Sequence, residues 1–113
     1  MPLSLTELTN AMSAAARSAG QSASTAAGKD LTGDVERFVL PQMEGIASQI
    51  ISIQTGGFDE DTAQLLMSME IHHVSSVICS VSELVALEVQ NIINAALQAV
   101  ASLVNTSLRF TLL

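Results

Sequence analysis

The sequence predicts an all-α protein, and three observations lead to this fold class. Residues 59–113 contain no Gly and no Pro, the two residues that most often interrupt a helix. Apolar residues recur through this half at steps of three and four, the spacing of one helix face. Gly56-Gly57 followed by an acidic stretch indicates a helix stop and a restart. The predicted architecture is a helical hairpin with one long C-terminal helix and a flexible or helical N-terminal arm, assembling through helix packing.

Composition limits the classes of function that the chain can have. Its 113 residues are 49% hydrophobic but only 13% charged and 3% aromatic. An ordinary soluble domain carries about a quarter charged residues, so this chain lacks the usual charged coat. The net charge of −7 argues against nucleic acid, which needs a basic surface, and against an anionic membrane surface.

The first predicted region is an N-terminal arm over residues 1–29, rich in Ser and Ala. Small side chains bury little apolar area, so we predict a frayed helix or a flexible arm here. One apolar stripe is compatible with a helix and consists of Leu5, Leu8, Met12, Ala15 and Ala19.

The second predicted region, residues 30–113, is a helix-turn-helix assembly domain. Thr32 and Asp34 can cap a helix, and Pro41 suits a first helical turn or a kink. We predict a short helix over about 41–54 that ends at a Gly-Gly turn at 56–57. Its apolar stripe is Met43, Ile46, Ile50 and Ile53.

A long helix is predicted over about 60–110. Asp59 or Asp61 can cap its first turn, whose three acids suit the positive end of the helix dipole. Such a helix is about 75 Å long, whereas the preceding short helix is only about 20 Å long. The short helix covers about a third of it, so residues from about Val81 onward are expected to pack against other molecules.

The predicted function is therefore structural: a self-assembling helical subunit of a rod, needle, filament or ribbon. The partners would be copies of the chain itself or related subunits, packed side by side through the long helix. The residues predicted to pack are Ile78, Val81, Val85, Ile92, Val100, Leu103 and Val104. Those predicted to set the register are Asn91, Asn94 and Gln98.

Two other functions stay open from the sequence. Residues 89–108 carry no charge, so the chain could be a membrane-active protein of the holin or pore type. The Asn and Gln side chains there are too many for a lone span facing lipid, although a bundle of spans tolerates them. Alternatively, the stripe is the core of a compact helical adaptor domain.

The sequence contains no recognisable catalytic, cofactor or metal site, so we predict that the protein is not an enzyme. Glu70 and His73 have the spacing used in di-iron bundles, but that site needs a second such motif, and a surface ion pair fits as well. His72 and His73 could make packing between copies pH-dependent. The single cysteine, Cys79, is expected to be a small buried hydrophobe, about two helical turns from His72 and out of its reach.

One stretch resembles a known family. Asp61, Gln64-Leu65-Leu66-Met67-Ser68-Met69-Glu70-Ile71, Gln90-Asn91-Ile92 and Leu97 are similar to the C-terminal part of type III secretion inner-rod subunits. The resemblance covers residues 61–97. It implies a small helical subunit that polymerises beneath a secretion needle and is exported without a cleaved signal. No cleavable secretory signal is recognisable, so export would use a route that does not cut one. The resemblance favours a place in the cell envelope or outside the cell, and a cytoplasmic polymer stays open.

Overall fold

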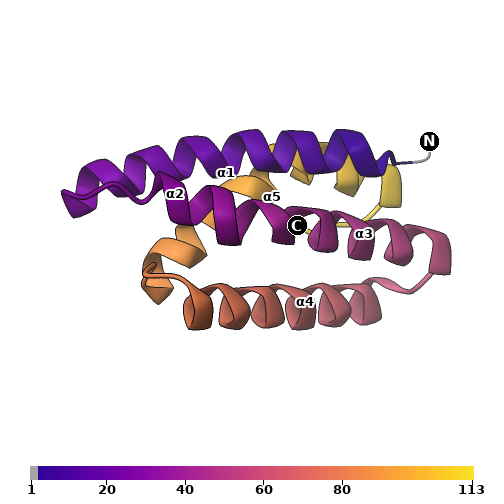
Figure 1. Ribbon diagram of the computed structural model, residues 1–113. Coiled ribbons are helices and arrows are strands. Elements are labelled where there is room, and N and C mark those ends of the chain that lie inside the picture. Colours follow the sequence, from indigo (N-terminus) through magenta and orange to yellow (C-terminus); the bar gives the residue numbers. More distant parts are fainter. Residues whose placement is uncertain (1–2) are drawn as a thin grey trace.

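The computed structural model describes residues 3–113, which form an all-α bundle measuring 43 × 22 × 18 Å. Its elements are α1 (Leu5–Ala27), α2 (Thr32–Asp34), the π-helical turn η1 (Val35–Val39), α3 (Leu40–Gly56), α4 (Glu60–Val81) and α5 (Ala86–Leu108). Four of these are long helices that lie alongside one another (Figure 1). The predicted fold class is confirmed, but two of its predicted elements have a different structure.

Helix α1 occupies the region predicted as the N-terminal arm. The Ser4 hydroxyl accepts a hydrogen bond from the Glu7 amide at the start of the helix, and Gly28 ends it with a φ of 71°. One face, formed by Leu8, Met12, Ala16 and Gly20, is buried in the bundle. Of the two predicted alternatives, a flexible or a helical arm, the helical one is confirmed; the arm is not frayed, because small side chains let α1 lie close to its neighbours. Residues 1 and 2 of the predicted arm lie outside the described residues.

The next helical run begins at Thr32 and contains a widened turn before a proline. The Leu40 amide donates to the Val35 carbonyl, five residues back, which makes η1 a π-helical turn. Pro41 has no amide hydrogen and its ring crowds the preceding turn, so a wider turn accommodates it. α3 then runs over Leu40–Gly56, close to the predicted 41–54, and Gly57 (φ 64°) follows as a left-handed cap.

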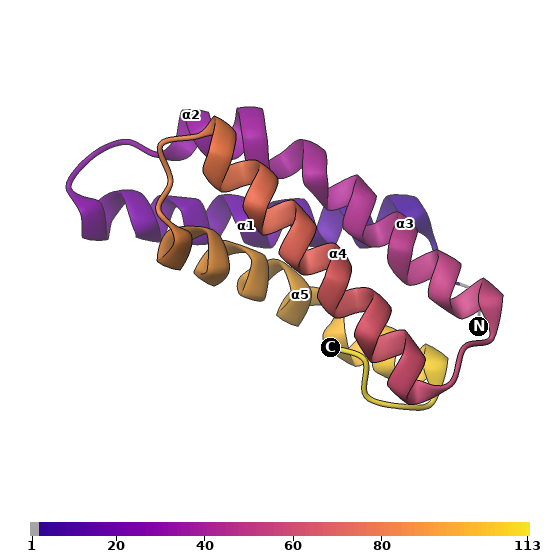
Figure 2. The same ribbon diagram turned by 90° about the horizontal axis from the view of Figure 1, so that it is seen from below.

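The prediction of one long helix over 60–110 was wrong. α4 ends at Val81, the backbone is extended at Ser82 (ψ 172°) and Val85 (ψ 160°), and α5 begins at Ala86. The chain reverses direction within these few residues, so α5 runs back along α4 (Figure 2). The reversal needs no Gly or Pro because both residues have negative φ values, −114° and −84°.

Tertiary contacts hold this reversal in place. The Leu84 side chain is only 3% exposed and anchors the turn in the core. The Glu83 amide donates to Asp34 Oδ2 over 2.9 Å, a contact with the start of the α2–η1–α3 run. The Val85 amide donates to Glu88 Oε1 over 3.0 Å, which satisfies an otherwise free donor at the start of α5.

A single hydrophobic core includes residues of all four long helices. α5 packs along α1 and also contacts α4, whereas α3 packs against both α1 and α4 (Figures 1 and 2). The buried residues of α5 are Val89, Ile92, Ile93, Ala96, Val100 and Val104. The expectation that residues after Val81 need other molecules to bury them is therefore corrected: α1 and α4 bury this stripe within one chain.

The last residues fold back onto the bundle instead of extending the helix. Arg109 has a φ of 67°, which ends α5 with a left-handed residue. The Asn105 side chain then accepts hydrogen bonds from the Leu112 and Leu113 amides over 2.8 and 3.1 Å. The Gln64 side chain of α4 donates to the Thr111 carbonyl over 2.7 Å, so the tail also links α5 to α4.

Candidate interaction surface

The residues predicted to pack between copies fall into two groups. Ile78, Ile92, Val100 and Val104 are at most 2% exposed and lie in the core of the single chain. Their assignment to an interface between folded copies is corrected, because these side chains already belong to the hydrophobic core of the single chain. The others remain at the surface, and their exposed fractions are 53% for Val81, 58% for Val85 and 45% for Leu103.

The three residues predicted to set the register are all exposed on α5 but do not form one strip. Asn91 lies beside the C-terminal end of α1, in a hollow that also includes Ala23 and Ala27. Asn94 and Gln98 line a different hollow, on the side of α5 where the C-terminal Leu113 lies. These amides can therefore contact a partner from two directions, but they cannot act as a single row.

The outer side of the α1–α5 pair carries few charged side chains. We call it the α1–α5 face; its exposed or half-exposed residues are Ser4, Glu7, Ala11, Ala15, Ser18, Ser22, Ala26, Leu87, Asn91, Ala95, Ala99, Leu103 and Thr106. Glu7 is the charged residue among these, and Glu88 and Arg109 border the face where they line its two hollows. Arg17, the next charged residue along α1, points toward η1 instead, where its Nε atom lies 2.7 Å from Glu36 Oε1. The face is therefore made mainly of small and neutral side chains.

Two hollows lie at opposite ends of the α1–α5 face. One, of about 610 Å³, lies where α1 begins and α5 ends, and its lining includes Leu3 and Leu103 beside the charged Glu7 and Arg109. The other, of about 270 Å³, lies where α1 ends and α5 begins, and its lining includes Val85 and Leu87 beside the charged Glu88. Leu87 is 65% exposed, the highest exposed fraction among the large hydrophobic side chains at the surface. Apolar side chains thus lie at both ends of the face, beside a small number of charged ones.

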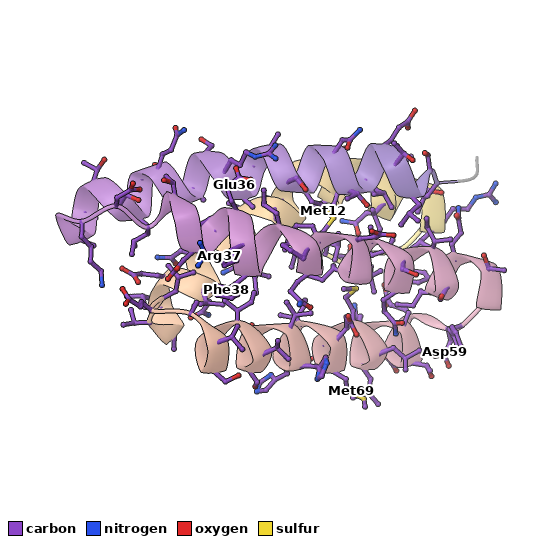
Figure 3. The ribbon with its side chains drawn as sticks, in the orientation of Figure 1. Met12, Glu36, Arg37, Phe38, Asp59 and Met69 are labelled. Carbon is purple, nitrogen blue, oxygen red and sulfur yellow. The ribbon has the colours of Figure 1, made fainter. Side chains whose placement is uncertain are left out.

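Most charged side chains lie away from the α1–α5 face. Four of the acids, Asp59, Glu60, Asp61 and Glu70, belong to α4 and its cap, on the other side of the bundle from α1. Lys29 Nζ lies 3.9 Å from Glu83 Oε2 near the α4–α5 turn. The Arg37 guanidinium lies 5.8 Å from the centre of the Phe38 ring (Figure 3). The strongly acidic character of the protein is therefore concentrated away from the α1–α5 face.

Two carboxylates have a lowered pKa because they cap backbone turns. Hydrogen bonds from the Thr62 side chain and amide hold the pKa of Asp59 below its usual value of 3.8. The side chain and amide of Thr32 act in the same way on the pKa of Asp30. Both groups serve the start of a helical segment, which is a structural role and not a catalytic one.

The outer side of α4 carries the other exposed apolar side chains. Leu65 and Met69 are each 60% exposed, and Met69 points away from the bundle while Met12 points into it (Figure 3). Their spacing of four residues places them on the side of α4 opposite to its buried residues Ala63 and Met67. Neither was predicted as an interaction residue. The sequence does contain a signal for an exposed apolar patch here, because apolar residues recur on two opposite sides of this helix.

The predicted pH-sensing residues also lie on α4. His72 and His73 are both exposed, as is Cys79, so the prediction of a buried cysteine was wrong. Cys79 turns out of the core because α4 buries Val74 and Ile78 instead. His72 and Cys79 line a groove of about 460 Å³ between α4 and α5, together with Ser76 and Gln90. Among residues 3–113, no three His, Cys, Asp or Glu side chains gather in a way that could hold a metal ion.

By length and composition, α5 could cross a membrane. Its mean hydropathy over the most apolar window is 1.2, and 39% of that window is buried inside the bundle. The core helix of a soluble bundle has the same properties, and α5 packs between α1 and α4 here. Comparisons with protein-family models, with curated proteins and with solved structures each found no match to this chain.

Proposed function

We propose that the protein is a non-catalytic structural subunit that acts by packing against copies of itself through the α1–α5 face. The observation that carries this proposal is the distribution of charge. Each copy has a net charge of −7, so two copies repel one another over most of their surfaces. The α1–α5 face is the large surface on which two copies can meet without bringing many carboxylates together.

The size of the face suits a specific contact. Two adjacent helices of 23 residues each present a surface about 35 Å long and about 20 Å wide. This corresponds to about 700 Å² for each partner, near the roughly 800 Å² of a standard protein–protein interface. The Ala and Ser side chains along α1 allow close approach, whereas Leu87 and Leu103 provide the larger apolar contacts.

A pair formed by one face on itself closes after two copies, whereas a polymer needs a second contact. Leu65 and Met69 on the outer side of α4 supply a second apolar patch, far from the α1–α5 face. A rod, filament or ribbon would use both surfaces in alternation. The first step, formation of the pair, is the part of the proposal that can be tested on its own.

Two matched substitutions test the pair. Leu87→Asp places a charge on the α1–α5 face, and Leu65→Asp places the same charge at a similarly exposed position on α4. In sedimentation equilibrium, we expect the parent and Leu65→Asp to form dimers at a concentration where Leu87→Asp stays monomeric. If Leu65→Asp alone lost association, α4 would be the interface and the proposal would be wrong. A parent protein that stays monomeric at millimolar concentration would also contradict it.

A second candidate function, insertion into a membrane, is favoured by the length and hydropathy of α5. It requires α5 to leave α1 and α4, because most of its large apolar side chains face them. Flotation with vesicles of neutral lipid tests this function. Protein that floats with the vesicles and releases a trapped dye would favour insertion over packing between copies, whereas protein that stays at the bottom would exclude it.

A further inference from the structure

The short connection between α4 and α5 has features of a hinge. We define the hinge as residues 82–85, Ser-Glu-Leu-Val, which contain no Gly and no Pro. Ser82 and Val85 are extended, yet both have negative φ values and can adopt helical angles without steric strain. Because residues 59–108 contain no helix breaker at all, nothing local prevents α4 and α5 from joining into one helix.

The hinge residues themselves make few polar contacts, and most of these are exposed to water, including the ion pair between Glu83 and Lys29. The Glu83 amide is held by Asp34, and the Val85 amide is held by Glu88, both in exposed hydrogen bonds. The Leu84 amide donates to the Ser82 hydroxyl over 3.2 Å. A continuous helix would replace each of these bonds with a backbone bond to the residue four positions earlier. Leu84 is the buried anchor that opening would displace.

We propose that the hinge opens and that two copies exchange α5, giving a domain-swapped dimer. In each copy α4 and α5 form one helix from about 60 to 108, about 73 Å long. The α5 of one copy then packs against α1 and α4 of the other. Ile92, Ala96 and Val100 regain in the partner the environment that they have in the monomer, so the core contacts are conserved. This exchange does not depend on the α1–α5 face.

A proline at position 86 is compatible with the closed form of the hinge but not with the open form. Ala86 is the first residue of α5, it is exposed, and Val85 before it already has the extended backbone that proline requires. Ala86→Pro therefore fits the closed monomer. In the open form the same proline lies in the middle of a helix, where it removes a hydrogen bond and crowds the preceding turn.

Glu60→Pro is the matched control. Glu60 is the first residue of α4 and follows Asp59, which is also extended (φ −69°, ψ 167°). This position starts the helix in both forms, so the control proline should not change the exchange. Each protein is concentrated, warmed to the middle of its unfolding transition, cooled, and analysed by size-exclusion chromatography with light scattering.

We expect the parent and Glu60→Pro to give a dimer that dissociates slowly on dilution, because exchange requires partial unfolding. We expect Ala86→Pro to lower the dimer association constant by about a hundredfold or more. The double variant Ser82→Ala/Val85→Ala, which favours helix in the hinge, should raise it. The proposal is overturned if Ala86→Pro dimerises as readily as Glu60→Pro, or if the double variant forms no dimer. Leu87→Asp should still exchange, which distinguishes swapping from packing through the α1–α5 face.

Discussion

The two sides of the bundle are built differently. Along the α1–α5 pair, α1 contributes mostly small side chains, and the two helices pack along most of their length. α4 on the other side contacts α3 and α5 but makes little contact with α1, and it leaves Leu65 and Met69 in water. The first side is tightly packed inside and carries few charges outside, whereas the second is acidic and carries isolated apolar residues.

This difference shows that small residues do not indicate a loose segment. Ala16 is fully buried and Gly20 is buried, although each contributes little area by itself. A Cβ atom added at Gly20 would lie 2.7 Å from Val35 Cγ2, so the close approach of α1 to η1 depends on the missing side chain. Close packing along a whole helix compensates for the small size of each contact.

The largest effect is expected from truncating the centre of the bundle. Ile92→Ala removes a fully buried side chain of α5 and should lower the free energy of unfolding by about 2–5 kcal/mol. Leu103→Ala, on the exposed side of the same helix, should lower the free energy of unfolding by much less, because Leu103 is 45% exposed. Urea unfolding followed by circular dichroism measures both. Equal losses would show that α5 does not have the buried and exposed sides described here.

Enlarging a small residue should distinguish the two sides of the bundle. Ala16→Leu forces additional volume into the tightly packed interior and should cost about 1–3 kcal/mol of unfolding free energy. The control Ser76→Leu, at an exposed position on α4, should change stability by no more than about 0.5 kcal/mol. Tolerance of both substitutions in thermal unfolding would contradict the close packing of α1.

Acidification should weaken the start of α4 through Asp59. Because its pKa is lowered in the folded protein, the ionised carboxylate stabilises the fold. That contribution is fully present above the ordinary value of 3.8 and is lost as the pH falls through the lowered pKa. We expect Asp59→Ala to lower the melting temperature at pH 7, and the difference from the parent should disappear in strong acid. A difference that is the same at both pH values would show that the charge is not involved.

The smallest effect is expected from the ion pair between α1 and η1. Arg17 and Glu36 are each 54% exposed, so their 2.7 Å contact is well solvated. Arg17→Met should lower the free energy of unfolding by about 0.2–1 kcal/mol, and high salt should reduce the difference. Chemical unfolding in low and high salt measures this. A loss as large as that of Ile92→Ala would mean that Arg17 has a role in packing that its exposure does not indicate.

Signals that act within a few residues could be interpreted from the sequence. Gly56-Gly57 and the acids after them marked the end of α3 and the start of α4, because a left-handed residue and an N-cap are local features. Of the residues predicted to pack on α5, Ile92, Val100 and Val104 are buried, whereas Leu103 is not. What the apolar stripe could not identify was the partner, because the same stripe fits α1 of its own chain or another copy.

The reversal at the hinge was not predictable in the same way. Leu84 turns the chain by entering the core, and Asp34 holds the Glu83 amide from a position 49 residues earlier. Neither contact has a signature in the residues around the turn, whose composition is compatible with a continuous helix. The candidate interaction surface shows the same limit. Val85, Leu103 and Ile92 were all predicted to pack between copies, but only the tertiary fold shows that the first two remain exposed while Ile92 does not.

Hydrogen exchange of the monomer tests the reversal between α4 and α5 most directly. At micromolar concentration, we expect the amides of residues 83–87 to exchange quickly, between a protected α4 and a still more strongly protected α5. This gap in protection reports that the two helices are separate and that α5 lies in the core of its own chain. Uninterrupted protection from residue 64 to residue 108 in a protein shown to be monomeric would mean that the helix is continuous, and it would contradict the structure described here.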